Sequence, residues 1–164
     1  MIYQLATDDI QAILTVVNDA AIVYEGKIPG DMWKEPYMPV QELKEEIRNG
    51  VQFYCWKEND ALIAVMGIQV VDDVTLIRHA YVLPAHQRKG LGQKLLKHLF
   101  GLAETRQVYV GTWKAAGWAV KFYEKNGFKL VSTAEKNRLL RKYWKIPERH
   151  VETSVVLQLK RQPR

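Results

Sequence analysis

The chain has 164 residues, of which 48% are hydrophobic and 26% are charged. This balance is typical of a globular domain and argues against disorder, a collagen-like chain or a coiled coil. The apolar runs fall far short of the roughly 20 residues of a membrane-spanning helix, and the N-terminus lacks the features of a secretory signal. A single cysteine, Cys55, excludes an internal disulfide. We therefore expect one cytoplasmic domain covering residues 1–164.

Lys and Arg number 24 against 18 Asp and Glu, which gives a net charge of +6. A basic balance favours an anionic partner, which leaves nucleic acid, a membrane surface or a phosphorylated small molecule open. Alternatively, the excess of solvated lysines only keeps the protein in solution.

The first fifty residues predict a strand over residues 2–5 and then an amphipathic helix that begins near Thr7. Residues 24–39 contain two Gly and three Pro and carry several aromatic side chains. They predict a long loop, and loops of this length are usually functional or mobile. A second short helix ends at Asn49-Gly50, a pair that favours a left-handed helix stop.

The remainder alternates between strand and helix patterns. Strands are expected over residues 51–57, 61–71, 74–83, 108–112, 128–132 and 151–160, and helices over 90–104, 115–126 and 135–144. This order predicts an α+β domain with a mixed, mostly antiparallel sheet.

The hexapeptide QRKGLG (residues 87–92) follows a predicted strand and opens a predicted helix. Glycines let a backbone approach an anion, and the free amides of a helix N-terminus attract negative charge. Arg88, Lys89 and Lys94 would add positive charge, which suits a phosphate or pyrophosphate. The spacing fits neither a Walker loop nor the dinucleotide fingerprint. Alone, the string is equally consistent with a tight turn before a helix.

A second string, AVKFYEKNGF (residues 119–128), reads alone as an amphipathic helix with Ala119, Phe122 and Tyr123 facing inward. An Asn-Gly stop and a new strand follow.

Together, the two strings and the order of elements resemble the GNAT superfamily of N-acetyltransferases, most strongly from about residue 74 to residue 130. The resemblance implies a central sheet of about seven strands with flanking helices, splayed between its fourth and fifth strands, where acetyl-CoA binds. It implies cofactor contacts from Val82, Leu83, Gln87, Arg88, Lys89, Gly90, Leu91, Gly92, Ala119 and Phe122. Ala116 stands where many members carry an asparagine that contacts the cofactor.

The resemblance also implies that Tyr123 protonates the CoA thiolate when an amine attacks the thioester directly in a ternary complex. A phenol stays protonated at pH 7 and can act as a general acid. Cys55 is then a buried strand residue rather than an acyl carrier.

The general base is less defined, because residues 75–80 (TLIRHA) lack the carboxylate that many members place on this strand. Glu25 is the first candidate, since it lies in the loop where the family builds acceptor contacts. His79 is the second, since imidazole titrates near neutrality. Each also has an ordinary interpretation, Glu25 as a solvated loop residue and His79 as a partly buried strand residue.

We therefore expect an enzyme that acetylates a primary amine of a small molecule or a peptide. The alternative is a non-catalytic module that binds acyl-CoA or nucleic acid through its basic surface. The basic run over residues 136–145 fits such a surface, or a solvated amphipathic helix that packs Leu139 and Leu140 inward. No metal is expected, because His86, His98 and His150 lack ligand spacing. The sequence leaves a homodimer, the acyl-chain length and the acceptor open.

Overall fold

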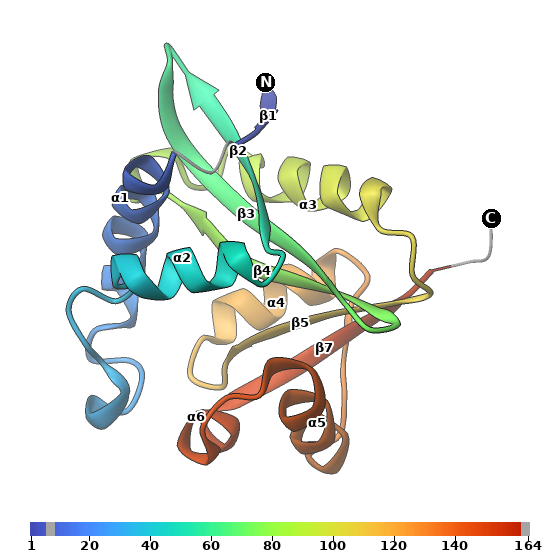
Figure 1. Ribbon diagram of the computed structural model, residues 1–164. Helices are drawn as coiled ribbons and strands as arrows, with labels where there is room; N and C mark the ends of the chain where they lie inside the picture. The colour runs from blue at the N-terminus through green and yellow to red at the C-terminus, as the bar shows by residue number, and fades with distance from the viewer. Residues whose placement is uncertain (6–8, 162–164) are drawn as a thin grey trace. The chain divides into compact units, whose positions relative to one another are not determined.

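A computed structural model describes residues 1–5 and 9–161, so the helix start predicted at Thr7 lies outside the described residues. The strands are β1 (Ile2–Gln4), β2 (Gln52–Glu58), β3 (Ala61–Val71), β4 (Val74–Val82), β5 (Gln107–Trp113), β6 (Lys129–Leu130) and β7 (Ser154–Lys160). The helices are α1 (Ile10–Ala21), α2 (Val40–Arg48), α3 (Leu91–Leu102), α4 (Gly117–Lys125), α5 (Thr133–Leu139) and α6 (Glu148–Glu152) (Figure 1). The strand order is β1-β2-β3-β4-β5-β7-β6, which confirms the predicted α+β class with seven strands.

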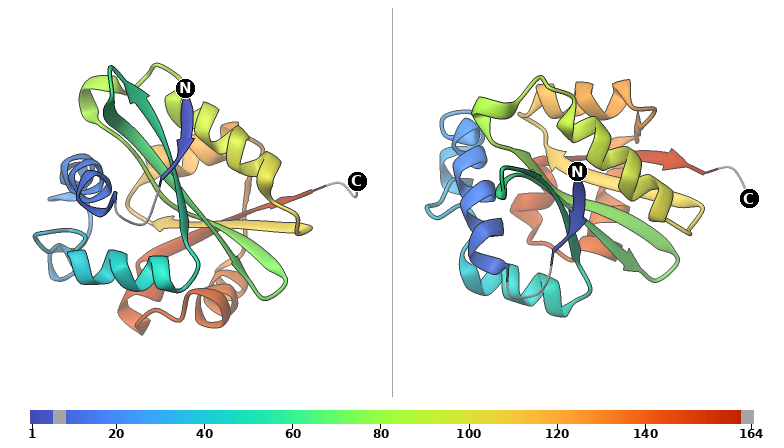
Figure 2. Two further views of the ribbon diagram at one scale, coloured as in Figure 1. Left: turned by 45° about the horizontal axis from the view of Figure 1, so that its top comes forward. Right: turned by 90° about the horizontal axis from the view of Figure 1, so that it is seen from above.

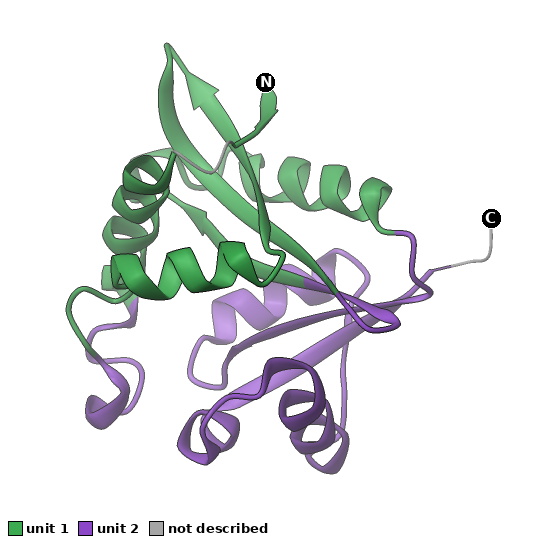
Figure 3. Ribbon diagram, in the orientation of Figure 1, with its two compact units in different colours: residues 1–23, 34–70, 77–103 green, residues 24–33, 71–76, 104–164 purple. Residues whose placement is uncertain are grey.

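The chain divides into two compact units (Figure 3). Unit 1 comprises residues 1–23, 34–70 and 77–103, and unit 2 comprises residues 24–33, 71–76 and 104–164. Each unit is assembled from segments that are distant in the sequence. The single domain over residues 1–164 stays a prediction.

In unit 1, β1, β2 and β3 pair antiparallel, with Cys55 opposite both Tyr3 and Val65. Helices α1 and α2 lie on one side of these strands and α3 on the other (Figures 1 and 2). Because successive strand residues point to opposite faces, β2 contributes side chains to both sides of these strands.

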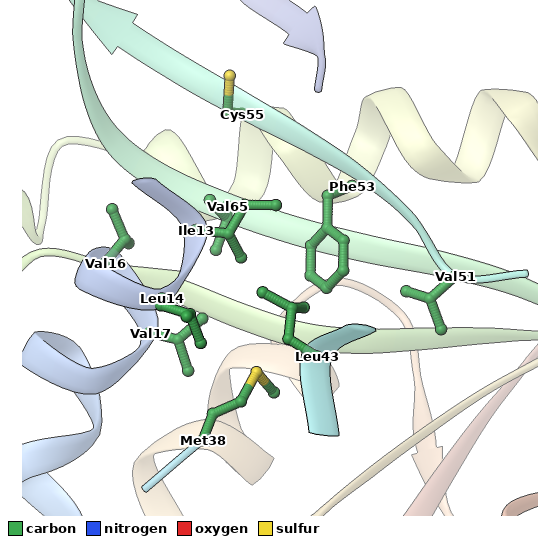
Figure 4. Close-up of a cluster of buried hydrophobic side chains, with 10 residues drawn as sticks. All are labelled: Ile13, Leu14, Val16, Val17, Met38, Leu43, Val51, Phe53, Cys55 and Val65. Carbon is green, nitrogen blue, oxygen red and sulfur yellow. The ribbon is translucent and has the colours of Figure 1, made fainter. Parts of the chain in front are cut away.

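The side of α1 and α2 is closed by a buried apolar cluster (Figure 4). Its members are Ile13, Leu14, Val16, Val17, Met38, Leu43, Val51, Phe53, Cys55 and Val65. Fully burying one such large side chain stabilises the fold by about 1.5–3 kcal/mol. The cluster therefore fixes α2, the helix that carries Glu46, against the strands.

In unit 2, β7 pairs antiparallel with both β5 and β6. One cluster joins Tyr109 and Val156 of these strands to Leu139, Leu140 and Tyr143. The inward positions predicted for Leu139 and Leu140 are therefore confirmed.

Close packing explains the glycine at position 111. A Cβ added there would lie 3.3 Å from Trp144, at the end of the π-helical turn Leu140–Trp144. The glycine therefore lets the aromatic ring approach the backbone of β5.

One structural expectation was wrong. The final strand begins at Ser154 rather than at residue 151, because the chain forms the short helix α6 directly after Pro147. Proline suits the position before a helix, where no amide hydrogen bond is lost. Five residues are too few to show helical periodicity.

Candidate cofactor loop and catalytic residues

The segment before α3 exposes backbone amides. Arg88 and Gly90 both adopt left-handed backbone, with φ values of 66° and 75°. The first bond of the helix runs from the Lys94 amide to the Gly90 carbonyl at 3.0 Å. The amides of residues 91–93 therefore precede the helical ladder and have no partner within the helix. A Cβ at Gly90 would meet no atom within 4 Å. This open turn fits a phosphate group.

Hydrogen bonds hold this loop against the end of β4. Gln87 Nε2 donates to the Val82 carbonyl at 3.1 Å. The Leu83 amide donates to the Ile63 carbonyl at 2.9 Å, and the Leu83 carbonyl accepts from the His86 amide at 2.9 Å. The Leu83 amide is thus engaged within the protein, so any cofactor contact from Leu83 depends on its other atoms.

The positive charges near the loop are distributed unevenly. Arg88 and Lys89 are exposed, and Lys89 Nζ lies 3.5 Å from His86 Nδ1. Lys94, in contrast, places its ammonium over the Trp56 ring of β2, 5.0 Å from the centroid. Arg88 and Lys89 are therefore the cations available to an anion at the loop.

Tyr123 lies on α4 in unit 2 and is only 5% exposed. Phe122 and Phe128 contact its ring edge-on, at centroid distances of 5.1 and 5.7 Å. Burial, with a smaller contribution from Tyr24, raises the pKa of Tyr123 well above that of an ordinary phenol. Within the described residues, no hydrogen bond engages its hydroxyl. The side chain is thus a protonated donor and not a base.

Two further predicted contacts, Ala119 and Phe122, lie half-buried on the same helix. Ala116, which caps this helix, is fully buried and offers no side-chain oxygen. The positions of Ala119 and Phe122 agree with the helix predicted from the sequence, and the contacts of these two residues with a cofactor stay predictions.

Glu25 is exposed, directly after the short turn Ile22–Tyr24. The neighbouring Tyr24 ring stacks on Trp118 at 6.1 Å and meets Trp113 edge-on at 6.4 Å. Trp113 in turn stacks on His150 at 4.7 Å. Glu25 therefore lies at the border of an aromatic group in unit 2, and its role stays a prediction.

His79 has a partner that was missed in the sequence. Its Nε2 contacts Glu46 Oε2, and Glu46 Oε1 accepts from Arg78 Nη2 at 3.1 Å. Burial raises the pKa of Glu46, but His79 and Arg78 outweigh burial and hold that pKa below its usual value. One signal pointed to Glu46, because it follows the buried Leu43 by three residues and so shares its helix face.

The basic run offers few unpaired charges. Arg141 forms two hydrogen bonds with Glu148, at 2.9 and 2.8 Å, and Arg138 pairs with Glu135. Lys136 is buried, and its Nζ donates to the Val151 carbonyl at 2.8 Å. Most of this segment's charge is therefore engaged within unit 2.

Two features are absent over residues 1–5 and 9–161. These residues contain no group of three or more His, Cys, Asp or Glu side chains arranged to hold a metal ion. No helix in that part of the chain is long and apolar enough to cross a bilayer.

Comparison with known proteins defines the family to which the chain belongs. The profile described as Acetyltransferase (GNAT) family matches residues 16–128, which is more than half of the chain. The chain therefore belongs to the GNAT family of acetyltransferases, as the two motifs predicted.

One curated relative is an uncharacterized N-acetyltransferase from the lysA 3' region of Bacillus methanolicus, with 33% identity over 61 residues. That match covers 36% of this chain and 51% of the relative, so the chain spans about half the length of the curated relative it matches.

Solved structures share the fold. PaiA N-acetyltransferase from Thermoplasma acidophilum, in complex with coenzyme A, has a TM-score of 0.74 at 16% identity and 98% coverage of both chains. Rv2747 from Mycobacterium tuberculosis, also with CoA, has a TM-score of 0.69 at 17% identity and 99% coverage of both. The ribosomal-protein-S18-alanine N-acetyltransferase of Escherichia coli has a TM-score of 0.63 at 19% identity, covering 98% of this chain and 92% of its own.

Proposed function

We propose that this protein transfers an acetyl group from acetyl-CoA to a primary amine by direct attack in a ternary complex. The observation that carries this proposal is the open, left-handed turn at residues 87–92, whose amides and cations suit a pyrophosphate. Membership of the GNAT family and neighbours with bound coenzyme A support it.

Each candidate residue has a part in this proposal. The amides of residues 88–92, with the side chains of Arg88 and Lys89, bind the pyrophosphate. Val82, Leu83 and Gln87 line the pantetheine arm, and Ala119 and Phe122 contact the cofactor from α4. The acetyl thioester supplies the electrophilic carbonyl.

Tyr123 donates its hydroxyl proton to the thiolate that leaves. Its raised pKa keeps the hydroxyl protonated at any physiological pH, so the proton is present when the thiolate leaves. Glu25 either anchors the acceptor ammonium or removes its proton through water.

A nucleic-acid module is the weaker alternative. Such a module needs free cations to neutralise phosphates, whereas the run at residues 136–145 engages Lys136, Arg138 and Arg141 within the protein. The acceptor is therefore proposed to be a small-molecule or peptide amine. Both kinds are compatible with the family, and one neighbour carries the name of a ribosomal-protein-alanine acetyltransferase.

The direct test is a panel of small amines and peptides assayed for thiol release from acetyl-CoA. Amine-dependent release, with a matching acetylated product by mass spectrometry, is the expected result. Binding of acetyl-CoA without release for any amine would favour a non-catalytic acyl-CoA module instead.

A further inference from the structure

A buried polar network in unit 1 connects α2 with β3 and β4. The side chains of Glu46, Arg78 and His79 are only 14%, 17% and 16% exposed. Arg78 donates to Glu46 and also to Gln69 Oε1 at 3.1 Å, and Gln69 Nε2 donates to the Asn49 carbonyl at 3.0 Å. Charged groups at this depth are costly to bury unless each is paired.

The backbone of β4 departs from extended geometry at His79. Successive strand residues normally point to opposite faces, yet Arg78 and His79 both reach the same carboxylate. His79 achieves this with a φ of 54° in the middle of the strand. For a residue other than glycine such a conformation costs about 1–3 kcal/mol, and in the middle of a strand it is often associated with a functional site. Arg78 alone would have neutralised Glu46, so charge balance does not explain His79.

The contact with Glu46 also fixes which imidazole nitrogen is free. His79 Nε2 and Glu46 Oε2 are both buried and have no hydrogen-bond partner other than this mutual contact. A carboxylate beside Nε2 favours the tautomer that carries its proton there, which leaves the lone pair on Nδ1. Within the described residues, Nδ1 has no hydrogen-bond partner. Phe53 stacks on the ring at 6.0 Å and restricts its rotation.

We propose that His79 is the general base of the acetyl transfer and that Glu46 is its positioning residue. This inference rests on the proposed function, and of the two roles given there to Glu25 it leaves that of anchor for the acceptor ammonium. His79 precedes Val82 by three residues on β4, about 10 Å along the strand, and both belong to the same unit as the loop at residues 87–92. The Nδ1 lone pair takes one proton from the acceptor ammonium, and the nitrogen of the amine keeps the electron pair that attacks the thioester. As the C–N bond forms and the C–S bond breaks, the nitrogen loses a second proton, which passes through solvent to the Tyr123 oxygen once Tyr123 has protonated the thiolate. The imidazolium, paired with the Glu46 carboxylate, later releases its proton to solvent.

The charged neighbours of His79 define the expected pH dependence. Among the described contacts of unit 1, they are Glu46 from α2 and Arg78 from the same strand. Removing the carboxylate in Glu46→Gln leaves an arginine beside the ring, and its positive charge disfavours the imidazolium that forms when the base takes the proton. The acidic limb of the kcat/KM profile should therefore differ between the wild-type chain and Glu46→Gln.

Three variants test the proposal. His79→Gln should lower kcat/KM at pH 7 by about 100-fold or more, with partial recovery at high pH. Glu46→Gln should lower it about 10-fold, and both variants should keep their affinity for acetyl-CoA. Glu45→Gln is the matched control, since it removes an exposed carboxylate from the same helix and should change neither quantity.

A purely structural network would lower the melting temperature in Glu46→Gln and His79→Gln while leaving the pH profile of the folded fraction unchanged, and that result would overturn the proposal. The second measurement is an NMR titration of the His79 ring in the wild-type chain and in Glu46→Gln. An unchanged titration midpoint would overturn the pairing even if the chain proved to acetylate amines. Failure of the proposed function would appear differently, as no amine-dependent thiol release from the wild-type chain.

Discussion

Gly90→Asp is the sharpest perturbation of the cofactor loop. Gly90 has a φ of 75°, and a Cβ at this position would meet no atom within 4 Å. The cost to folding is therefore conformational only, about 1–2 kcal/mol for a left-handed residue with a side chain, and smaller for aspartate than for most.

The effect on ligand affinity should be larger than the effect on folding. A carboxylate about 5 Å from one phosphate charge is disfavoured by about 0.8 kcal/mol in water and about 3 kcal/mol at an effective dielectric constant of 20. The two charges of a pyrophosphate double these values to about 2–6 kcal/mol. Acetyl-CoA should therefore bind at least about 20-fold more weakly.

Thermal denaturation with acetyl-CoA measures this difference. At a concentration 100 times the wild-type Kd, the ligand stabilises the wild-type chain by about 2.7 kcal/mol, but a 20-fold weaker variant by only about 1 kcal/mol. For a chain of this size these values correspond to shifts of roughly 5–11 °C and 2–4 °C.

A matched control separates charge at the loop from charge elsewhere. Gly50 also has a positive φ, 100°, and open space around a Cβ, and it lies in the same unit. Gly50→Asp should keep the full acetyl-CoA shift. An unchanged shift in folded Gly90→Asp would refute the assignment of this loop to the pyrophosphate.

Three other predictions can be tested with the same protein. Tyr123→Phe should lower turnover by about 10- to 1,000-fold with little change in acetyl-CoA affinity, and full activity across the pH range would show that water protonates the thiolate. Glu25→Gln should raise the KM for the amine, as expected of an anchor; a lower kcat at unchanged KM would assign the proton to Glu25 instead of His79, and wild-type kinetics would remove it from the site. Because the folded state lowers the pKa of Glu46, its ion pairs stabilise the protein above the unfolded value of 4.5 and lose this effect as the pH falls through the folded value. Melting curves below pH 5 should therefore depend less on pH in Glu46→Gln, and an unchanged dependence would contradict this linkage.

Much of the fold was predictable because its signals are local. The Asn-Gly pair after α2 predicted a stop, and Gly50 indeed adopts left-handed backbone there. The leucine spacing of α3 reports which face of that helix is buried. Leu102 continues this spacing but is 43% exposed, because the last residue of a helix has no following turn to cover it.

The cofactor loop and the candidate base differed in how far the sequence alone could reveal them. The loop at residues 87–92 was visible because its glycine, its cations and its helix start are consecutive in the sequence. The contact between Glu46 and His79 was not visible, because it joins two elements that are separated by β2 and β3 along the chain.

The backbone of β4 shows why the sequence alone did not predict the contact of His79 with Glu46. An alternating pattern over residues 75–80 places Arg78 and His79 on opposite faces, so only one of them would be expected to meet a partner from α2. The left-handed conformation at His79 removes that constraint, and no sequence rule predicts it for a histidine. The observation that this strand lacks a carboxylate therefore gave an incomplete description of the site. The carboxylate next to the candidate base comes from α2, and it reaches β4 because Leu43 and the apolar cluster around it fix that helix against the strands.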